Sequence, residues 1–184
     1  MRRLACILAL SAGPALADGL EIDVEGEANG TIVIDLFEDV APLHVEQMTA
    51  LAAEGFYNGV VFHRVIEGFM AQTGDGQFGN INAEGFSMQM AGRGGSDRDD
   101  IVAEFSDITY ARGTVGMARS QNPDSANSQF FIMFAPGPFL DGQYTVVGEV
   151  TAGMEVVDAI KRGDGPNGAV IGEPDVMVEV RVTD

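Results

Sequence analysis

The segment from Phe62 to Gln72 (FHRVIEGFMAQ) places one arginine among large apolar side chains, with a glutamine at its end. Because a guanidinium is a rigid donor that keeps its charge, Arg64 could polarise one atom of an apolar ligand held beside it. A second segment, residues 128–134 (SQFFIMF), again sets an amide, Gln129, beside aromatic residues. Neither segment contains an activated nucleophile. Spacing alone leaves open the alternative that Arg64 is buried and satisfies backbone carbonyls.

The elements that position these residues follow from side-chain periodicity. Residues 60–66 are β-branched or aromatic at most positions, which favours a strand. Since successive side chains of a strand point to opposite faces, this strand places Arg64 on one face with Phe62, and His63 on the other. Gly68 interrupts the run, where we expect a bulge or bend.

The rest of the chain reads as strands and two helices, without internal repeats. Apolar residues alternate within residues 30–37, as on the buried face of a strand. Pro42 suits the first turn of a helix over residues 40–54, with Leu43 on its apolar stripe. We expect further strands at 113–119, 129–134, 145–150 and 176–182, a second helix at 154–161 and a long glycine-rich loop at 74–100.

Residues 1–17 have the three parts of a secretory signal peptide. A positively charged start (MRR) precedes an apolar stretch, and Ala15-Leu16-Ala17 forms a cleavage site. The apolar stretch is too short for a transmembrane helix. We therefore expect a single domain over residues 18–184, periplasmic or secreted, with no membrane contact after cleavage. Since Cys6 is the only cysteine, this domain would have neither disulfides nor thiolate ligands.

The chain is strongly acidic, with 28 acidic and 10 basic residues and a net charge of −18. Removal of Arg2 and Arg3 with the leader would make the charge two units more negative. Such a charge disfavours nucleic acid and anionic lipid as partners. The length, the 46% of hydrophobic residues and the 24 glycines predict one globular, turn-rich domain of the β-barrel or sandwich class.

Other chemistries lack their residue patterns. The two histidines, His44 and His63, are not spaced as metal ligands, and the aspartates between residues 97 and 100 do not complete a calcium loop. The Gly-x-Ser-x-Gly turn of a serine hydrolase is absent. The glycines at 92–95 are not followed by the Lys-Ser/Thr pair of a phosphate-binding loop. We therefore expect no metal and no cofactor, and we interpret His63 as a packed side chain.

Several motifs, taken together and in order, closely resemble the cyclophilin family of peptidyl-prolyl cis-trans isomerases. They are residues 62–75 (FHRVIEGFMAQTGD), 117–120 (MARS), 125–132 (SANSQFFI), 139–150 (FLDGQYTVVGEV) and 153–160 (GMEVVDAI). Separate motifs in the right order are far harder to match by chance than one signature. The resemblance runs from about residue 29 to the C-terminus, and with the leader it suggests a bacterial exported branch. It implies a mainly β fold: a closed antiparallel eight-stranded β-barrel capped by two α-helices.

The resemblance also implies roles for individual residues. Arg64 would be the catalytic donor, and Gln72 would hold it in position. The implied substrate-binding residues are Phe69, Met70, Ala118, Arg119, Gln129, Phe131, Phe139, Leu140 and Tyr144. Among these, Phe69, Met70, Phe131 and Leu140 would form the apolar pocket for the proline ring.

Two positions depart from the best-known eukaryotic pattern, which has tryptophan in place of Phe139 and histidine in place of Tyr144. Bacterial members often differ there, so isomerisation is still implied, but Phe139 suggests weaker binding of cyclosporin. The expected protein is a monomer that acts on proline-containing polypeptides and assists the folding of exported proteins. The alternative is a chaperone or adaptor that binds proline-containing segments in the same groove without catalysis.

Overall fold

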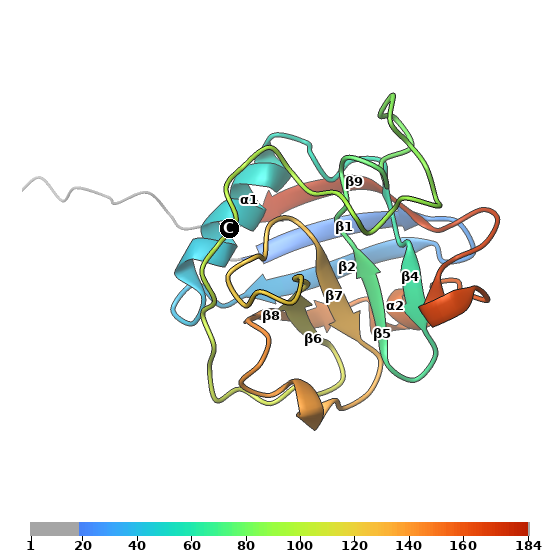
Figure 1. Cartoon of the computed structure of the whole chain (residues 1–184). Helices are drawn as coiled ribbons and strands as arrows, with labels where there is room; N and C mark the ends of the chain where they lie inside the picture. The colour runs from blue at the N-terminus through green and yellow to red at the C-terminus, as the bar shows by residue number, and fades with distance from the viewer. Residues whose placement is uncertain (1–18, 184) are drawn as a thin grey trace, which may run out of the picture.

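A computed structural model describes residues 19–183, so the predicted leader and Cys6 lie outside the described residues. The strands form one antiparallel sheet in the order β3-β9-β1-β2-β8-β6-β7-β5-β4 (Figure 1). The strands are β1 (Gly19–Glu25), β2 (Gly30–Leu36), β3 (Val60–Val61), β4 (Arg64–Ile66), β5 (Met70–Thr73), β6 (Thr114–Met117), β7 (Phe130–Met133), β8 (Val146–Ala152) and β9 (Val176–Thr183). The helices are α1 (Pro42–Ala53) and α2 (Met154–Ala159), with 3-10 turns η1 (Pro138–Leu140) and η2 (Pro166–Gly168).

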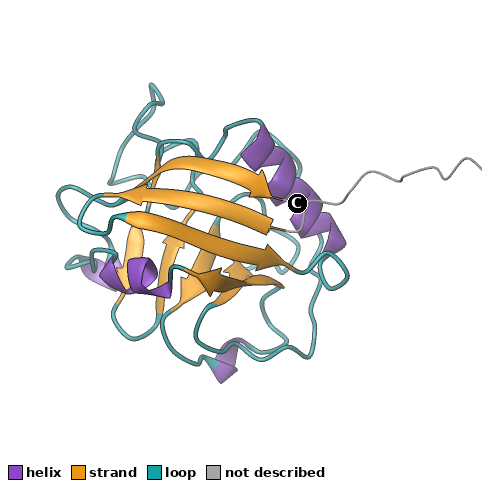
Figure 2. Cartoon of the chain, turned by 180° about the vertical axis from the view of Figure 1, so that it is seen from behind, coloured by secondary structure: helices purple, strands orange, loops and turns teal. Residues whose placement is uncertain are grey.

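The sheet is an open, curled half-barrel of nine strands, and the prediction of a closed eight-stranded barrel is wrong (Figures 1 and 2). Its two edge strands, β3 and β4, are consecutive in the chain, with only Phe62 and His63 between them. The backbone N–H of Phe62 donates to Asp175 O beside β9, whereas that of His63 donates to Gln72 O on β5. The chain itself therefore crosses from one edge of the sheet to the other here, and no ladder of hydrogen bonds joins β3 to β4.

This crossing also changes the faces predicted for residues 60–66. The prediction of one continuous strand is wrong, since β3 pairs with β9 and β4 pairs with β5. Phe62 is fully buried in the main core together with Val65, so it does not share the face that carries Arg64. The break between the two strands removes the simple alternation on which the prediction relied.

The two helices lie at opposite ends of the curled sheet, as Figure 2 shows. The buried side of α1 contains His44, Val45, Met48, Leu51 and Ala52. Leu43, predicted on the apolar stripe, is 48% exposed. The first turn of α1 is capped from a distant loop, because the Glu104 carboxylate accepts hydrogen bonds from the N–H groups of Leu43 and His44, both at 3.1 Å. Within residues 19–183, no helix has the length and apolar character needed to span a membrane.

Residues 74–100 form the predicted long loop, without a helix or strand. Asp75, which is fully buried at the start of this loop, fixes its course. One carboxylate oxygen accepts the N–H groups of Gln77 and Phe78 at 3.0 and 2.9 Å, and the other accepts those of Gly92 and Gly94 at 2.7 and 3.0 Å. A single side chain therefore ties the glycine-rich part of the loop to the end of β5.

Candidate active site

The guanidinium of Arg64 is held on three sides by neutral acceptors. β4 and β5 pair with Arg64 directly opposite Gln72, and residues opposite each other in an antiparallel pair have side chains on the same face. Arg64 Nη1 donates to Gln72 Oε1 at 3.1 Å. Its Nε donates to Asn167 O at 3.0 Å, and its Nη2 donates to Asn167 Oδ1 at 3.1 Å. This arrangement fixes the fork of the guanidinium while leaving its charge uncompensated.

Asn167 contacts Arg64, and the sequence analysis missed this contact. It lies in η2, 103 residues from Arg64, and is the only described non-glycine residue with a positive φ, 56°. Asparagine tolerates this left-handed conformation better than most residues. The Pro166-Asn167-Gly168 sequence is a recognisable turn signal, but nothing in it indicates a contact with Arg64.

A line of amides continues from Arg64 into the long loop. Gln72 Nε2 donates to Gln129 Oε1 at 2.9 Å, and Gln129 Nε2 donates to Gly94 O at 2.7 Å. Each side-chain amide thus accepts a hydrogen bond through its oxygen and donates one through its nitrogen, which fixes the orientation of both side chains. Because Asp75 holds the N–H of Gly94, the position of Arg64 is linked through these contacts to the buried carboxylate of the loop.

A cavity of about 440 Å³ adjoins Arg64, and we call it the apolar cavity because Met70, Phe131 and Leu140 form its buried floor. Its lining brings together all the predicted site residues except Gln129, and adds Gln143: Arg64, Phe69, Met70, Gln72, Ala118, Arg119, Phe131, Phe139, Leu140, Gln143 and Tyr144. Met70, Phe131 and Leu140 are buried and belong to a second, smaller core cluster. Phe139 is 62% exposed and lies 5.4 Å from Phe69 between ring centroids, so it forms the rim.

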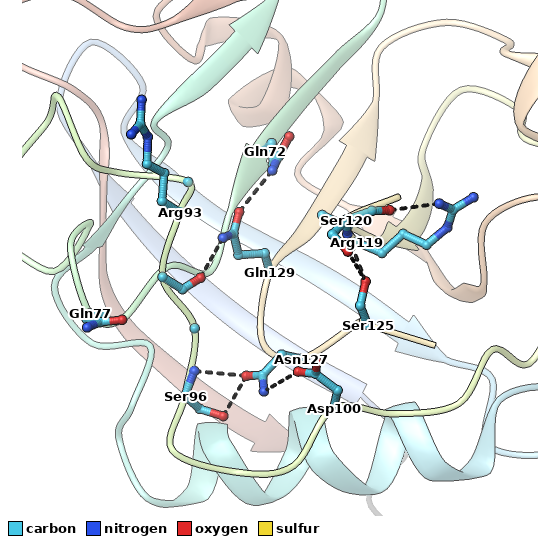
Figure 3. A pocket seen from close by; sticks show the side chains of 14 residues that line it. Gln72, Gln77, Arg93, Ser96, Asp100, Arg119, Ser120, Ser125, Asn127 and Gln129 are labelled. Carbon is cyan, nitrogen blue, oxygen red and sulfur yellow. Dashed lines mark hydrogen bonds between the residues drawn. The ribbon is translucent and has the colours of Figure 1, made fainter. Parts of the chain in front are cut away.

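A second cavity, of about 500 Å³ and polar in character, shares Gln72, Ala118 and Arg119 with the first (Figure 3). It lies between the glycine-rich part of the long loop and the segment that follows β6. Gln129 lines this cavity. The two cavities adjoin at their three shared residues, and together we call them the groove.

Burial shapes the electrostatics of the site. Desolvation lowers the pKa of Arg64 from its ordinary value, and Tyr144 opposes this shift. Arginine has so high an ordinary pKa that it stays charged. His63, the neighbour of Arg64, is buried beneath the groove, and burial lowers its pKa to about 4, against an opposing effect of Asp75. Near neutral pH, His63 is therefore uncharged, and the charged side chains that line the apolar cavity are Arg64 and Arg119.

The arrangement can bind and polarise, but it is not built for bond cleavage. A charged donor of fixed geometry beside a cavity with a buried apolar floor can stabilise an electron pair that develops during a reaction. Within residues 19–183, no group of three or more His, Cys, Asp or Glu side chains could hold a metal ion. The neutral His63 has no hydrogen-bond partner among these residues, so it does not activate a nucleophile there.

Comparison with known proteins gives a consistent result. Residues 20–182 match the family described as "Cyclophilin type peptidyl-prolyl cis-trans isomerase/CLD". A "Probable peptidyl-prolyl cis-trans isomerase" of Brucella suis is 55% identical over 154 residues, which cover 84% of this chain and 78% of the relative. A peptidyl-prolyl cis-trans isomerase of Acinetobacter baylyi is 38% identical over 169 residues, 87% of this chain and 82% of the relative. The crystal structure of a Cryptosporidium parvum cyclophilin in the presence of the dipeptide Ala-Pro has a TM-score of 0.74 and 25% identity, covering 90% of this chain and 99% of that one.

Proposed function

Because the chain belongs to the cyclophilin-type peptidyl-prolyl cis-trans isomerases, and is thus an isomerase of the bond that precedes proline, we propose that Arg64 is its catalytic residue. Gln72 and Asn167 act as positioning residues for Arg64. The observation that carries this assignment is the guanidinium fixed by three hydrogen bonds at the edge of the apolar cavity.

The reaction requires no broken bond and no transferred proton. Resonance gives the peptide bond a rotational barrier of about 18–20 kcal/mol. When the bond twists, this resonance is lost and the prolyl nitrogen gains a lone pair that a donor can stabilise. Arg64 has five N–H groups, and three of them contact Asn167 and Gln72. The remaining two can face the substrate, where the fixed charge favours the twisted state over both planar states.

The apolar cavity receives the proline ring. Met70, Phe131 and Leu140 are buried and supply an apolar floor, and a pyrrolidine ring has no donor that would be left unsatisfied there. The Cryptosporidium parvum cyclophilin studied in the presence of Ala-Pro supports this kind of ligand. Anchoring the ring while the preceding residue remains free to turn converts binding energy into preferential stabilisation of the twisted bond.

The substrates proposed here are exported proteins that fold outside the cytoplasm. The support is the charged, apolar and small-residue pattern of residues 1–17. Fractionation of cells that express the full chain, with N-terminal sequencing of the product, tests this. A mature form that begins at Asp18 outside the cytoplasm is expected, and an uncleaved cytoplasmic product would refute export.

The catalytic assignment is tested with a short peptide that contains one X-Pro bond. Exchange between its cis and trans forms is measured by NMR exchange spectroscopy with the wild-type protein, with Arg64→Ala and with Arg112→Ala. Arg112 is a matched control because it is an exposed arginine paired with Asp158 and lies outside both cavities. Arg64→Ala should reduce the exchange rate by about a thousandfold, whereas Arg112→Ala should retain it. A folded Arg64→Ala variant with the wild-type rate would remove Arg64 from the mechanism.

A further inference from the structure

Three arginines around the groove have no acidic partner among residues 19–183. Five of the described basic residues form ion pairs with carboxylates: Arg98, Arg112, Lys161, Arg162 and Arg181. The others, Arg64, Arg93 and Arg119, form none, and all three line the two cavities. In a chain with 28 acidic and 10 basic residues, a basic side chain placed without constraint would readily find a carboxylate. The unpaired charges are therefore a local property of the groove.

The contacts of these arginines hold the guanidinium groups without neutralising them. Arg119 donates to the backbone oxygens of Ser120 and Gln143, both at 2.8 Å, and lies over the ring of Tyr144 at 4.3 Å from its centroid. Arg93 makes no side-chain hydrogen bond with the described residues. Figure 3 shows Arg93 and Arg119 on either side of Gln129 in the view into the polar cavity. In this view both guanidinium groups extend away from Gln129, so the two charges lie at the rim of the cavity, and neither is neutralised by a carboxylate of the described residues.

One carboxylate, that of Asp100, also lines the polar cavity. Its Oδ1 accepts a hydrogen bond from Asn127 Nδ2 at 3.2 Å, and Asn127 Oδ1 in turn accepts the N–H and hydroxyl of Ser96. Asp100 is thus part of a polar network at the foot of the cavity. The lining of the two cavities contains three guanidinium groups and the carboxylate of Asp100, and the Asp75 carboxylate lies behind Gly92 and Gly94. Three positive charges against two negative ones leave the groove with a net positive charge on an otherwise acidic protein.

We propose that the polar cavity selects substrates that carry an acidic side chain two residues from the proline. This inference rests on the proposed function, because it places the proline ring in the apolar cavity. In an extended peptide, side chains two residues apart point to the same side and lie about 7 Å from each other. The two cavities share Gln72, Ala118 and Arg119, so a peptide with proline in the first directs the side chain two residues away into the second. Aspartate or glutamate is attracted there, and lysine is repelled.

The test compares matched peptides at about 0.15 M salt, where a Debye length of about 8 Å screens the distant carboxylates of the protein more than the charges inside the groove. One set has Glu, Gln or Lys two residues before the proline, and a second set has them two residues after it. We measure kcat/KM by NMR exchange with the full protein. In one of the two sets, kcat/KM for the Glu peptide should exceed that for the Lys peptide roughly fivefold, with the Gln peptide between them.

Two charge-removing variants of the long loop localise the effect. Arg93→Gln should reduce the Glu-to-Lys ratio to below about twofold. Arg98→Gln removes the same charge, but Arg98 is paired with Glu54 and lies outside both cavities, so it should keep the wild-type ratio. Thermal unfolding confirms that each variant is folded.

The outcomes separate this inference from the proposed function. Equal kcat/KM for the Glu and Lys peptides in both sets, with all peptides accelerated, overturns the acidic preference and leaves the catalytic assignment intact. Equal effects of Arg93→Gln and Arg98→Gln on the ratio also overturn it, because the preference would then follow the total charge. An absence of acceleration with every peptide would instead contradict the proposed function.

Discussion

Asn167 offers the sharpest test of how the catalytic arginine is positioned. Its side chain accepts one hydrogen bond from Arg64 Nη2 at 3.1 Å, and its backbone oxygen accepts another from Nε at 3.0 Å. Asn167→Gly removes the first bond and keeps the second. Glycine also adopts the φ of 56° without steric cost. The substitution therefore changes one contact of the guanidinium and little else.

The expected magnitude follows from that single contact. A hydrogen bond from a charged donor contributes about 1.5 kcal/mol, so its loss lowers the fraction of Arg64 in the productive orientation by roughly tenfold. Since Gln72 and the backbone of Asn167 still hold the guanidinium, the loss in kcat should stay well below that of Arg64→Ala. KM should change little, because the apolar cavity is unaltered.

Asn167→Ala is the matched variant. It removes the same hydrogen bond, but it also forces a side chain other than Asn or Gly into the left-handed region, at a cost of about 1 kcal/mol. Both variants should show the same kcat by NMR exchange, whereas the alanine variant should unfold at a lower urea concentration than the glycine variant. A glycine variant with the wild-type kcat, or two variants that differ in kcat by more than about threefold, would refute the positioning role.

Further predictions concern the loop, the buried histidine and the rim. Asp75→Asn replaces an oxygen that accepts two N–H groups by a donor, so urea unfolding should show a loss of about 3 kcal/mol; a loss below 1 kcal/mol would contradict the role given to Asp75. The pKa of His63 falls from 6.5 to about 4 on folding, so between these values the unfolded state binds a proton that the folded state does not. Neutral buried His63 therefore contributes to the free energy of unfolding by up to about 3 kcal/mol, a contribution that is complete above pH 6.5 and lost as pH falls towards 4. The free energy of unfolding of His63→Gln should depend less on pH between these values, and an unchanged pH dependence would refute this. Phe139→Trp should tighten cyclosporin binding in calorimetry, since an indole adds apolar area at the exposed rim; unchanged affinity would show that cyclosporin does not contact the rim there.

Local patterns predicted most of the strands, because alternation is a property of short segments. The strands expected around residues 30–37, 113–119, 129–134, 145–150 and 176–182 correspond to β2, β6, β7, β8 and β9. β1 was not predicted, although Leu20, Ile22 and Val24 alternate with acidic residues and are buried. The signal was present but lay directly after the leader. Closure of the barrel was predicted wrongly because it depends on how the two edges meet, which no local pattern reports.

The site was predictable where the motifs were contiguous. Arg64 and Gln72 belong to one contiguous motif, and they lie opposite each other because the chain reverses direction at Gly68, which has a φ of 69°. Asn167 was not predictable, because its role depends on a contact between segments 103 residues apart. The same holds for the fixing of Gly94 by Asp75, which requires the loop to return to its own start.

The pairing of β1 with β9 limits the order in which the sheet can form. Gly19 lies opposite Thr183 in this pair, so one edge of the first described strand is paired by the last described strand and by no other. A chain that leaves the ribosome from its N-terminus can form the β1–β2 hairpin early, but the other edge of β1 stays unpaired until residues 176–183 have emerged. An exposed strand edge is a template for wrong pairing with another chain. Nascent chains that stall before β9 should therefore be the most aggregation-prone form of this protein.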